Sequence, residues 1–301
     1  MALPTREIET IGSSPIGSLV YKSIREQSSA LSNIVDAVAD WDVPDGDIAR
    51  DLCIKVLPNI YPYVIVQYRI PVASTWEFGG VSNPHVRYRH LATKVQTGVV
   101  TIRPSDAIGM VIVRLVPESA AYILGERMQC FANTKISLSD LFGATDVSLL
   151  EERVREAPNS AERVASVLRF LGTKKSQREP DLLVCRAAAL LRRCPGLRVR
   201  QLASTLDISE RHLSRRFQTM FGTSPKQFAR MARIEKALMS RGRGSTWADI
   251  ACSCGFADQA HLINDFSAIV GAPPEHVLGS PLIGRGERNA VSADSHNFFA
   301  W

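Results

Sequence analysis

Residues 196–222 read Gly-Leu-Arg-Val-Arg-Gln-Leu-Ala-Ser-Thr-Leu-Asp-Ile-Ser-Glu-Arg-His-Leu-Ser-Arg-Arg-Phe-Gln-Thr-Met-Phe-Gly. Apolar residues recur at helical spacing in the first part of this stretch: Val199, Leu202, Ala203 and Leu206. A tight turn follows at Asp207-Ile208, and Ser209 is a good N-cap for a second helix. The inner face of that helix is formed by Leu213, Phe217 and Met220 or Phe221. The stretch therefore predicts two short helices that cross closely at the small side chain of Ala203.

The second of these helices has a polar outward face. The side chains predicted there are Glu210, Arg211, Ser214, Arg215 and Gln218. A helix-turn-helix places such a face in the major groove of DNA, where an arginine fork can donate two hydrogen bonds to guanine. His212 is expected to pack or to contact a phosphate group, and Arg216 is expected to contact a phosphate group. The alternative is that Arg211 and Arg215 are ordinary solvated arginines, and the motif favours groove contacts.

The same pattern returns about 49 residues later, in residues 247–271. Its first helix is predicted at Trp247–Ala251 and its turn at Cys254-Gly255-Phe256. Asp258 is the N-cap of its second helix, and the inner apolar face of that helix is formed by Leu262, Phe266 and Ile269. Four pairs of residues align at nearly constant offset: Ala203 with Ala251, Leu213 with Leu262, Phe217 with Phe266, and Gly222 with Gly271. An amphipathic helix is predicted between the units, from Pro225 to Ser240. The chain therefore contains an internal repeat of two helix-turn-helix units.

Residues 181–280 resemble the AraC/XylS family of bacterial transcription regulators. The matching residues of the first half are Leu202-Ala203, Ile208-Ser209, Leu213-Ser214-Arg215-Arg216-Phe217, Phe221-Gly222-Thr223-Ser224-Pro225 and Arg233-Ile234-Glu235-Lys236-Ala237. Those of the second half are Ile250-Ala251, Cys254-Gly255-Phe256-Ala257-Asp258, Phe266 and Val270-Gly271-Ala272-Pro273-Pro274. Because both halves and the linker helix agree together, the resemblance is more specific than a single motif. It implies double-stranded DNA as a partner and these DNA-binding residues: Arg211, His212, Ser214, Arg215, Arg216, Gln259, His261 and Asn264.

The second unit departs from the family pattern. The family usually has an Arg two residues before the inner-face Phe and a basic residue just after it, and Asn264 and Ser267 occupy these places. Gln259 and His261 remain as candidate base-edge readers. We therefore expect the first unit to supply most of the affinity and the second to contribute register or weak readout.

The charge distribution agrees with unequal units. Residues 1–180 contain 20 Lys/Arg and 20 Asp/Glu, whereas residues 181–243 contain 14 Lys/Arg and 4 Asp/Glu. Residues 244–280 contain 4 acids and no Lys or Arg. Neutralising phosphates supplies most non-specific affinity for DNA, so the basic segment is where DNA is expected to bind. A merely solvated basic surface is the alternative from charge alone.

Upstream of this region the pattern is extended. Runs of β-branched and aromatic residues at 61–70, 86–95, 98–102 and 109–116 are separated by Gly, Pro and Asn, which predicts a small, mainly antiparallel sheet or barrel. The acidic stretch 40–51 is typical of a loop. Helical patterns begin at Pro117, stop at Gly125 and continue at 148–157 and 161–171. Residues 115–125 and 138–143 resemble an N-terminal domain often joined to AraC-type regions, which implies a cupin-like sensing or dimerising module.

The predicted fold class is α+β. A β-rich, cupin-like N-terminal domain with flanking helices precedes an all-α C-terminal domain of two helix-turn-helix units joined by a linker helix. The expected organisation is a mobile segment at 1–30, an effector-sensing or dimerisation domain at 31–171, a linker at 172–180, the DNA-binding domain at 181–280 and a flexible tail at 281–301.

Other classes of protein are disfavoured by the sequence. No apolar run approaches the ~20 residues that span a bilayer, and residues 1–11 lack the apolar core of a secretion signal. Six cysteines without a CxxC pair indicate reduced thiols, and Cys252 and Cys254 lie on opposite helix faces, where they cannot chelate a metal. His85 and His90 lack the His-x-His and following Glu of a metal cupin. We therefore expect no metal, no cofactor and no catalytic site.

These observations predict a cytoplasmic, one-component transcription regulator. The N-terminal domain would bind a small-molecule effector or a partner and bias DNA occupancy and recruitment of RNA polymerase, and a homodimer is also expected. Two alternatives stay open: an enzyme whose catalytic barrel is targeted to DNA, and a constitutive DNA-binding protein whose N-terminal domain only dimerises.

Overall fold

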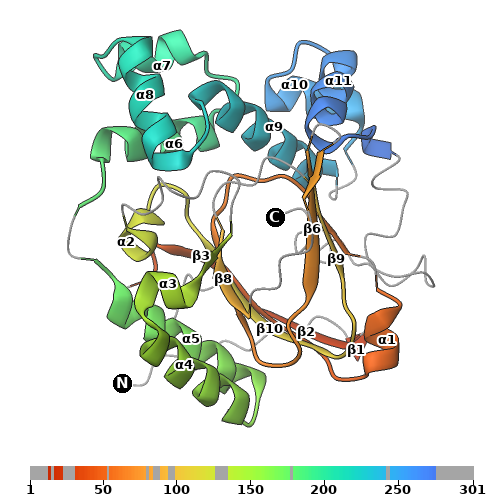
Figure 1. The fold of residues 1–301 in the computed structure, drawn as a ribbon. Coiled ribbons are helices and arrows are strands. Elements are labelled where there is room, and N and C mark those ends of the chain that lie inside the picture. The colour runs from red at the N-terminus through yellow and green to blue at the C-terminus, as the bar shows by residue number, and fades with distance from the viewer. Residues whose placement is uncertain are drawn as a thin grey trace, which may run out of the picture.

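The computed structural model describes residues 13–14, 17–22, 31–52, 54–78, 81–83, 89–93, 99–125, 135–176, 179–241 and 245–275. Two antiparallel sheets come first in the chain, with helices beside them, and an all-helical region follows (Figure 1). The predicted fold class is therefore confirmed. The tail at 281–301 lies outside the described residues.

The larger sheet has the strand order β1-β2-β3-β10-β5-β8-β11 in the described part of the chain. Its strands are β1 (Ser13–Ser14), β2 (Gly17–Lys22), β3 (Val35–Val43), β5 (Tyr63–Gln67), β8 (His90–Ala92), β10 (Ile108–Leu115) and β11 (Ile136–Ser137). The smaller sheet, in the order β4-β9-β6-β7, contains β4 (Ile54–Val56), β6 (Ala73–Phe78), β7 (Val81–Asn83) and β9 (Val99–Arg103).

Strand β10 is central because both of its faces are buried. Met110 and Ile112 join the core between the sheets, whereas Val111 and Val113 join the core on the opposite face. Side chains alternate across a strand, so burial on both faces requires the continuous apolar run seen in the sequence. The strand pairs antiparallel with β3 and β5, with Val113 opposite Val38.

Helices cover the outer face of the larger sheet. They are α2 (Ala121–Leu124), α3 (Leu138–Phe142), α4 (Ala144–Glu156) and α5 (Ser160–Lys174), and α1 (Gly46–Arg50) follows β3. Val154 and Val167 belong to the same core as the outer face of β10. Asn159 caps α5, since its side chain accepts a hydrogen bond from the Glu162 N–H at 3.0 Å.

Some boundaries predicted for this half differ from the structure. Residues 17–22, predicted to be mobile, form β2 and pair with β3. Residues 40–43, predicted to lie in an acidic loop, continue β3. Asp40 is buried there because its carboxylate accepts hydrogen bonds from the Tyr68 hydroxyl at 2.7 Å and from Arg163 Nε at 2.8 Å. A charge without partners would not be tolerated at this position.

The helical boundaries also shift. Pro117 does not begin α2, which starts at Ala121, although Gly125 ends it as predicted. Helix α5 continues past Gly172 to Lys174, into the predicted linker. Of the predicted strand at 86–95, the described residues contain β8 alone, and residues 84–88, 94 and 95 lie outside the described part of the chain.

The C-terminal region contains α6 (Leu182–Arg193), α7 (Val199–Thr205), α8 (Glu210–Phe221), α9 (Pro225–Arg241), α10 (Trp247–Cys254) and α11 (Gln259–Val270). Helix α9 lies between the α7/α8 pair and the α10/α11 pair, at one end of the sheets (Figure 1). Three phenylalanines pack where α8 meets α9, with ring centroids 4.6 Å apart for Phe217 and Phe221 and 5.3 Å apart for Phe217 and Phe228. The predicted helices of both units are confirmed.

The two halves of the chain share one apolar core. A single buried cluster runs from the residues between the sheets into the helices α6 to α11. At its edge Arg192 of α6 donates to Glu118, with Nη2 2.6 Å from Oε1 and Nε 3.3 Å from Oε2. The helical region is therefore docked on the sheets by apolar packing and by a two-bond ion pair.

Candidate nucleic-acid interface

The turns of the two helix pairs are built in the same way. In the first, the Ile208 N–H donates to the Ala203 carbonyl at 3.1 Å; in the second, the Phe256 N–H donates to the Ala251 carbonyl at 2.9 Å. The residue before each donor has a left-handed backbone, with φ of 54° at Asp207 and 79° at Gly255. Asp and Gly are among the residue types that most readily adopt this conformation. The repeat seen in the sequence is thus also a repeat of backbone geometry.

The second helix of each unit begins at a side-chain N-cap, but the N-cap of the second unit lies one residue farther from its turn than that of the first. The Ser209 hydroxyl accepts from the His212 N–H at 3.2 Å, and the Asp258 carboxylate accepts from the His261 N–H at 2.7 Å. The second turn contains one additional residue, Ala257. Its N–H donates to Nδ1 of His261 at 3.2 Å. The side chain of His261 therefore satisfies the backbone of the inserted residue.

Helix α8 presents two arginines to solvent. Arg211 and Arg215 are exposed, and neither forms an ion pair with any residue that the structure describes. Four residues apart, they lie one helical turn from each other on the same face. His212 beside them is exposed and Ser214 is half-buried. These four predicted site residues are therefore brought together on α8.

Arg216 is occupied within the protein. Its Nε donates to Asp181 Oδ2 at 2.7 Å and its Nη2 to Oδ1 at 2.5 Å. Asp181 is also the N-cap of α6, since Oδ1 accepts from the Val184 N–H at 3.2 Å. The structure thus gives Arg216 a role in fixing α8 to α6, and the predicted phosphate contact would compete with this two-bond pair.

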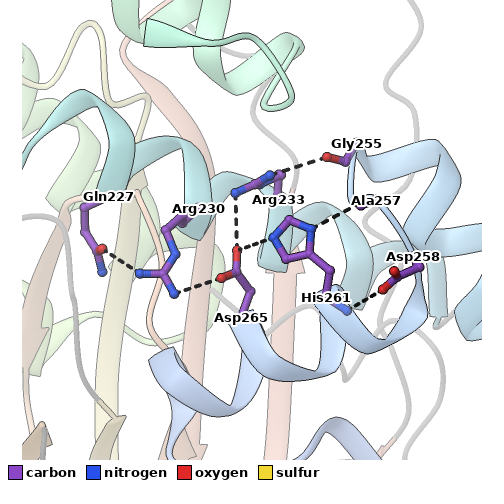
Figure 2. Close-up of polar contacts among 8 residues, drawn as sticks. All are labelled: Gln227, Arg230, Arg233, Gly255, Ala257, Asp258, His261 and Asp265. Carbon is purple, nitrogen blue, oxygen red and sulfur yellow. Dashed lines mark hydrogen bonds and ion pairs between the residues drawn. The ribbon is translucent and has the colours of Figure 1, made fainter.

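The corresponding face of α11 carries no cation. Gln259 and Asn264 are exposed, as a groove contact requires, and the predicted reader His261 accepts a hydrogen bond at Nδ1. Its Nε2 lies 3.8 Å from Asp265 Oδ2 (Figure 2). The ring also packs edge-on against Phe256, with centroids 5.5 Å apart. His261 thus supports the turn through Nδ1, while its side chain is 41% exposed, and base reading by His261 stays a prediction.

Two arginines of α9 lie beside α11 and share Asp265. Arg230 Nη2 donates to Oδ1 at 2.9 Å and Arg233 Nη2 to Oδ2 at 3.2 Å (Figure 2). The Arg233 guanidinium also stacks on Phe256, 5.0 Å from the ring centroid, and burial lowers the pKa of Arg233. Arg230 and Arg233, the two arginines beside α11, are thus held by an acid of the second unit.

Comparison with known proteins agrees with this geometry. Residues 202–280 match the family described as "Helix-turn-helix domain". Residues 202–280 are a helix-turn-helix domain of the AraC type. A search of the curated proteins gave no match.

Three solved structures are similar to the chain at low identity. ToxT from Vibrio cholerae has 12% identity and a TM-score of 0.44, over 80% of this chain and 97% of that chain. ToxT bound to (E)-4-(8-methylnaphthalen-1-yl)but-3-enoic acid has 14% identity and a TM-score of 0.46, and the match covers 80% of this chain and 97% of that chain. The AraC-like transcriptional activator CuxR has 14% identity and a TM-score of 0.26, and the match covers 78% of this chain and 82% of that chain.

A cavity of about 440 Å³ lies where the helix-turn-helix domain meets the sheets. Its charged lining residues are Asp36, Arg114, Arg192, Arg193, Glu235 and Lys236. Arg114 Nε donates to Asp36 Oδ2 at 2.6 Å, and the Arg114 guanidinium stacks on Tyr61, 4.4 Å from the ring centroid. Glu235 of α9 is only 6% exposed, and none of the described residues forms an ion pair or hydrogen bond with its carboxyl group. Burial raises the pKa of Glu235 to about 8.

The described residues also bear on two other kinds of site, one for a metal ion and one for a membrane. No group of three or more His, Cys, Asp or Glu side chains in that part of the chain could hold a metal ion. No helix there is long and apolar enough to cross a membrane. Cys252 is exposed and Cys254 is buried, so the two thiols lie on opposite sides of α10.

Sequence reasoning missed three features of the helix-turn-helix domain: the anchor of Arg216, the use of His261 in the turn, and the cluster at Asp265. Helix α6 itself was detectable, because Asp181 follows Pro180 and apolar residues recur from 183 to 191. The ion pairs could not be predicted from the sequence, because each joins residues 32 to 35 positions apart on different helices.

Proposed function

We propose that this protein is a sequence-specific DNA-binding transcription regulator that reads its operator mainly through α8. The observation that carries the proposal is the difference among its arginines. Arg211 and Arg215 are exposed and form no ion pair with a described residue, whereas Arg216 and Arg230 are held by Asp181 and Asp265.

This difference matters because a free guanidinium can bind DNA without breaking an internal ion pair. Arg is the side chain best suited to guanine, since its fork can donate to O6 and N7 together. Two arginines one turn apart on α8 can reach neighbouring positions in one major groove. On α11 the exposed polar residues are Gln259 and Asn264, which are neutral and release no counterions. The proposal therefore assigns most of the affinity to the first unit.

We further propose that the N-terminal region controls this binding and has no enzymatic activity. The support for control is the junction between the two regions. There α9 contributes Glu235 and Lys236 to a cavity whose other wall is formed by Asp36 and Arg114. A small-molecule effector bound there would contact both halves of the protein and could shift the balance between two docking states. RNA polymerase and a second copy of the chain are the further partners proposed for such a regulator in the cytoplasm.

Selection of DNA by the full chain tests the proposal. Purified protein is incubated with a pool of random-sequence duplexes, and the bound fraction is sequenced after several rounds. We expect enrichment of one discrete motif and a log affinity that falls linearly with log salt, by about 0.9 for each phosphate contact. Failure to enrich a motif, together with binding that does not respond to salt, would overturn the proposed function.

A further inference from the structure

The second helix-turn-helix unit depends on the linker helix for positive charge. Residues 244–280 contain no Lys or Arg, but Arg230 and Arg233 of α9 lie against α11. Both donate to Asp265, one to each carboxylate oxygen, as Figure 2 shows. The side chain of Asp265 is 15% exposed. One partly buried acid therefore holds two of the α9 cations that lie beside the second unit.

The two arginines differ in what else holds them. Arg233 is 16% exposed, donates to the Gly255 carbonyl at 3.4 Å and stacks on Phe256. These contacts anchor the turn and would remain without Asp265. Arg230 is 26% exposed, and its other partner is the neutral amide oxygen of Gln227 at 3.4 Å. Arg230 is thus the arginine whose availability depends on Asp265.

We propose that Asp265 limits the DNA affinity of the second unit by retaining Arg230 on the surface between α9 and α11. A carboxylate and a DNA phosphate compete for the same guanidinium, and the carboxylate is already in place at 2.9 Å. The inference rests on the proposed DNA-binding function and identifies a residue that makes the two units unequal. Asp265 acts here as an affinity-determining residue that need not touch DNA.

The first test is the salt dependence of binding by the Asp265→Asn variant. Asparagine keeps the size of the side chain and one acceptor oxygen for Arg233, but it removes the charge that holds Arg230. Fluorescence anisotropy of the full chain is measured on a duplex selected by the wild-type protein, between 50 and 200 mM salt. We expect the log–log slope to become more negative by about 0.9, which is about a 3.5-fold larger loss of affinity over this range than in the wild type.

The second test asks whether Arg230 supplies the new contact. In the wild-type background Arg230→Gln should leave the slope unchanged, because Arg230 is not on a phosphate. In the Asp265→Asn background the same substitution should return the slope to the wild-type value. Glu275→Gln is the matched control, since it removes one exposed negative charge from the same unit without freeing an arginine. Its effect should not depend on Arg230.

Two results would overturn the inference while leaving the proposed function intact. One is a folded Asp265→Asn variant with the wild-type slope, and the other is a reduced slope for Arg230→Gln alone. If Asp265→Asn does not fold, Arg230→Gln in the wild-type background still decides the question. A wild-type protein that selects no duplex and shows no salt dependence would instead overturn the proposed function.

Discussion

Replacing Glu235 by glutamine should change how the stability of the protein depends on pH. Glu235 lies on α9, is 6% exposed, and faces Asp36, Tyr61 and Arg114 across the junction and Arg192 of the neighbouring helix α6. Burial raises its pKa from 4.5 in the unfolded chain to about 8 in the folded protein. Between these two values the folded state keeps the proton and the unfolded state loses it. The stability that the protonated group provides is therefore fully present below pH 4.5 and is lost as the pH rises to about 8.

The size of the effect follows from the same two values. Each pH unit within the window lowers the free energy of unfolding by about 1.4 kcal/mol. From pH 5 to pH 8 the loss from this group is on the order of 4 kcal/mol. Glutamine carries no proton to lose, so Glu235→Gln should match the wild type near pH 5 and be the more stable protein at pH 8.

Urea unfolding followed by circular dichroism measures this difference at several pH values. Glu118→Gln is the matched control, because it removes a carboxylate at the same junction that is already paired with Arg192. That variant should lose about 1.5 to 3 kcal/mol at pH 7 and keep the decline between pH 5 and 8. A difference between Glu235→Gln and the wild type that is the same at pH 5 and at pH 8 would refute the reasoning.

Three further substitutions test separate parts of the structure. Arg216→Gln should lower the free energy of unfolding by about 1 to 3 kcal/mol, because it breaks the pair with Asp181. It should not change the slope of log affinity for DNA against log salt. A slope reduced by about 0.9 would instead place Arg216 on a phosphate. Gly255→Ala should destabilise the protein by roughly 1 kcal/mol or more, since φ is 79° and a Cβ would lie 3.0 Å from Gly196 Cα; an unchanged melting temperature would contradict this account of the turn. Phe217→Ala should lower the free energy of unfolding by about 3 to 5 kcal/mol, as expected for a fully buried ring, and a loss below 1 kcal/mol in urea unfolding would contradict the packing described for α8.

The helix-turn-helix domain was predictable because its signals are local. The N-caps Ser209 and Asp258 and the C-terminal glycines Gly222 and Gly271 stand at the ends of the helices that the structure contains. Capping and helical periodicity act within a few residues, so the sequence specifies them directly. The strand β10 was predictable for the same reason, because a continuous apolar run is what burial on both faces requires.

Other features could not be predicted from the sequence, because they depend on contacts between segments that are distant along the chain. Asp40 belongs to an acidic stretch that is typical of a loop, yet it lies on a buried strand because Arg163, more than 120 residues away, reaches its carboxylate. His261 has a contact that the sequence did not indicate, because the N–H of one inserted residue in the second turn donates to its ring. The sequence thus placed the candidate residues on α8 and α11, whereas the ion pairs of Arg216 and Arg230 became visible only in the packing.

The central claim is that α8 reads the operator and that α11 contributes little. Fluorescence anisotropy of the full chain on one selected duplex tests it most directly, with Arg215→Ala and Asn264→Ala compared at the same salt concentration. Loss of a bidentate contact to a base costs roughly 1 to 3 kcal/mol, so Arg215→Ala should weaken specific binding about ten- to hundredfold and relax the sequence preference at the position it reads. Asn264→Ala should cost much less. If Asn264→Ala weakened binding as strongly as Arg215→Ala, both helices would read bases equally and the account would be contradicted.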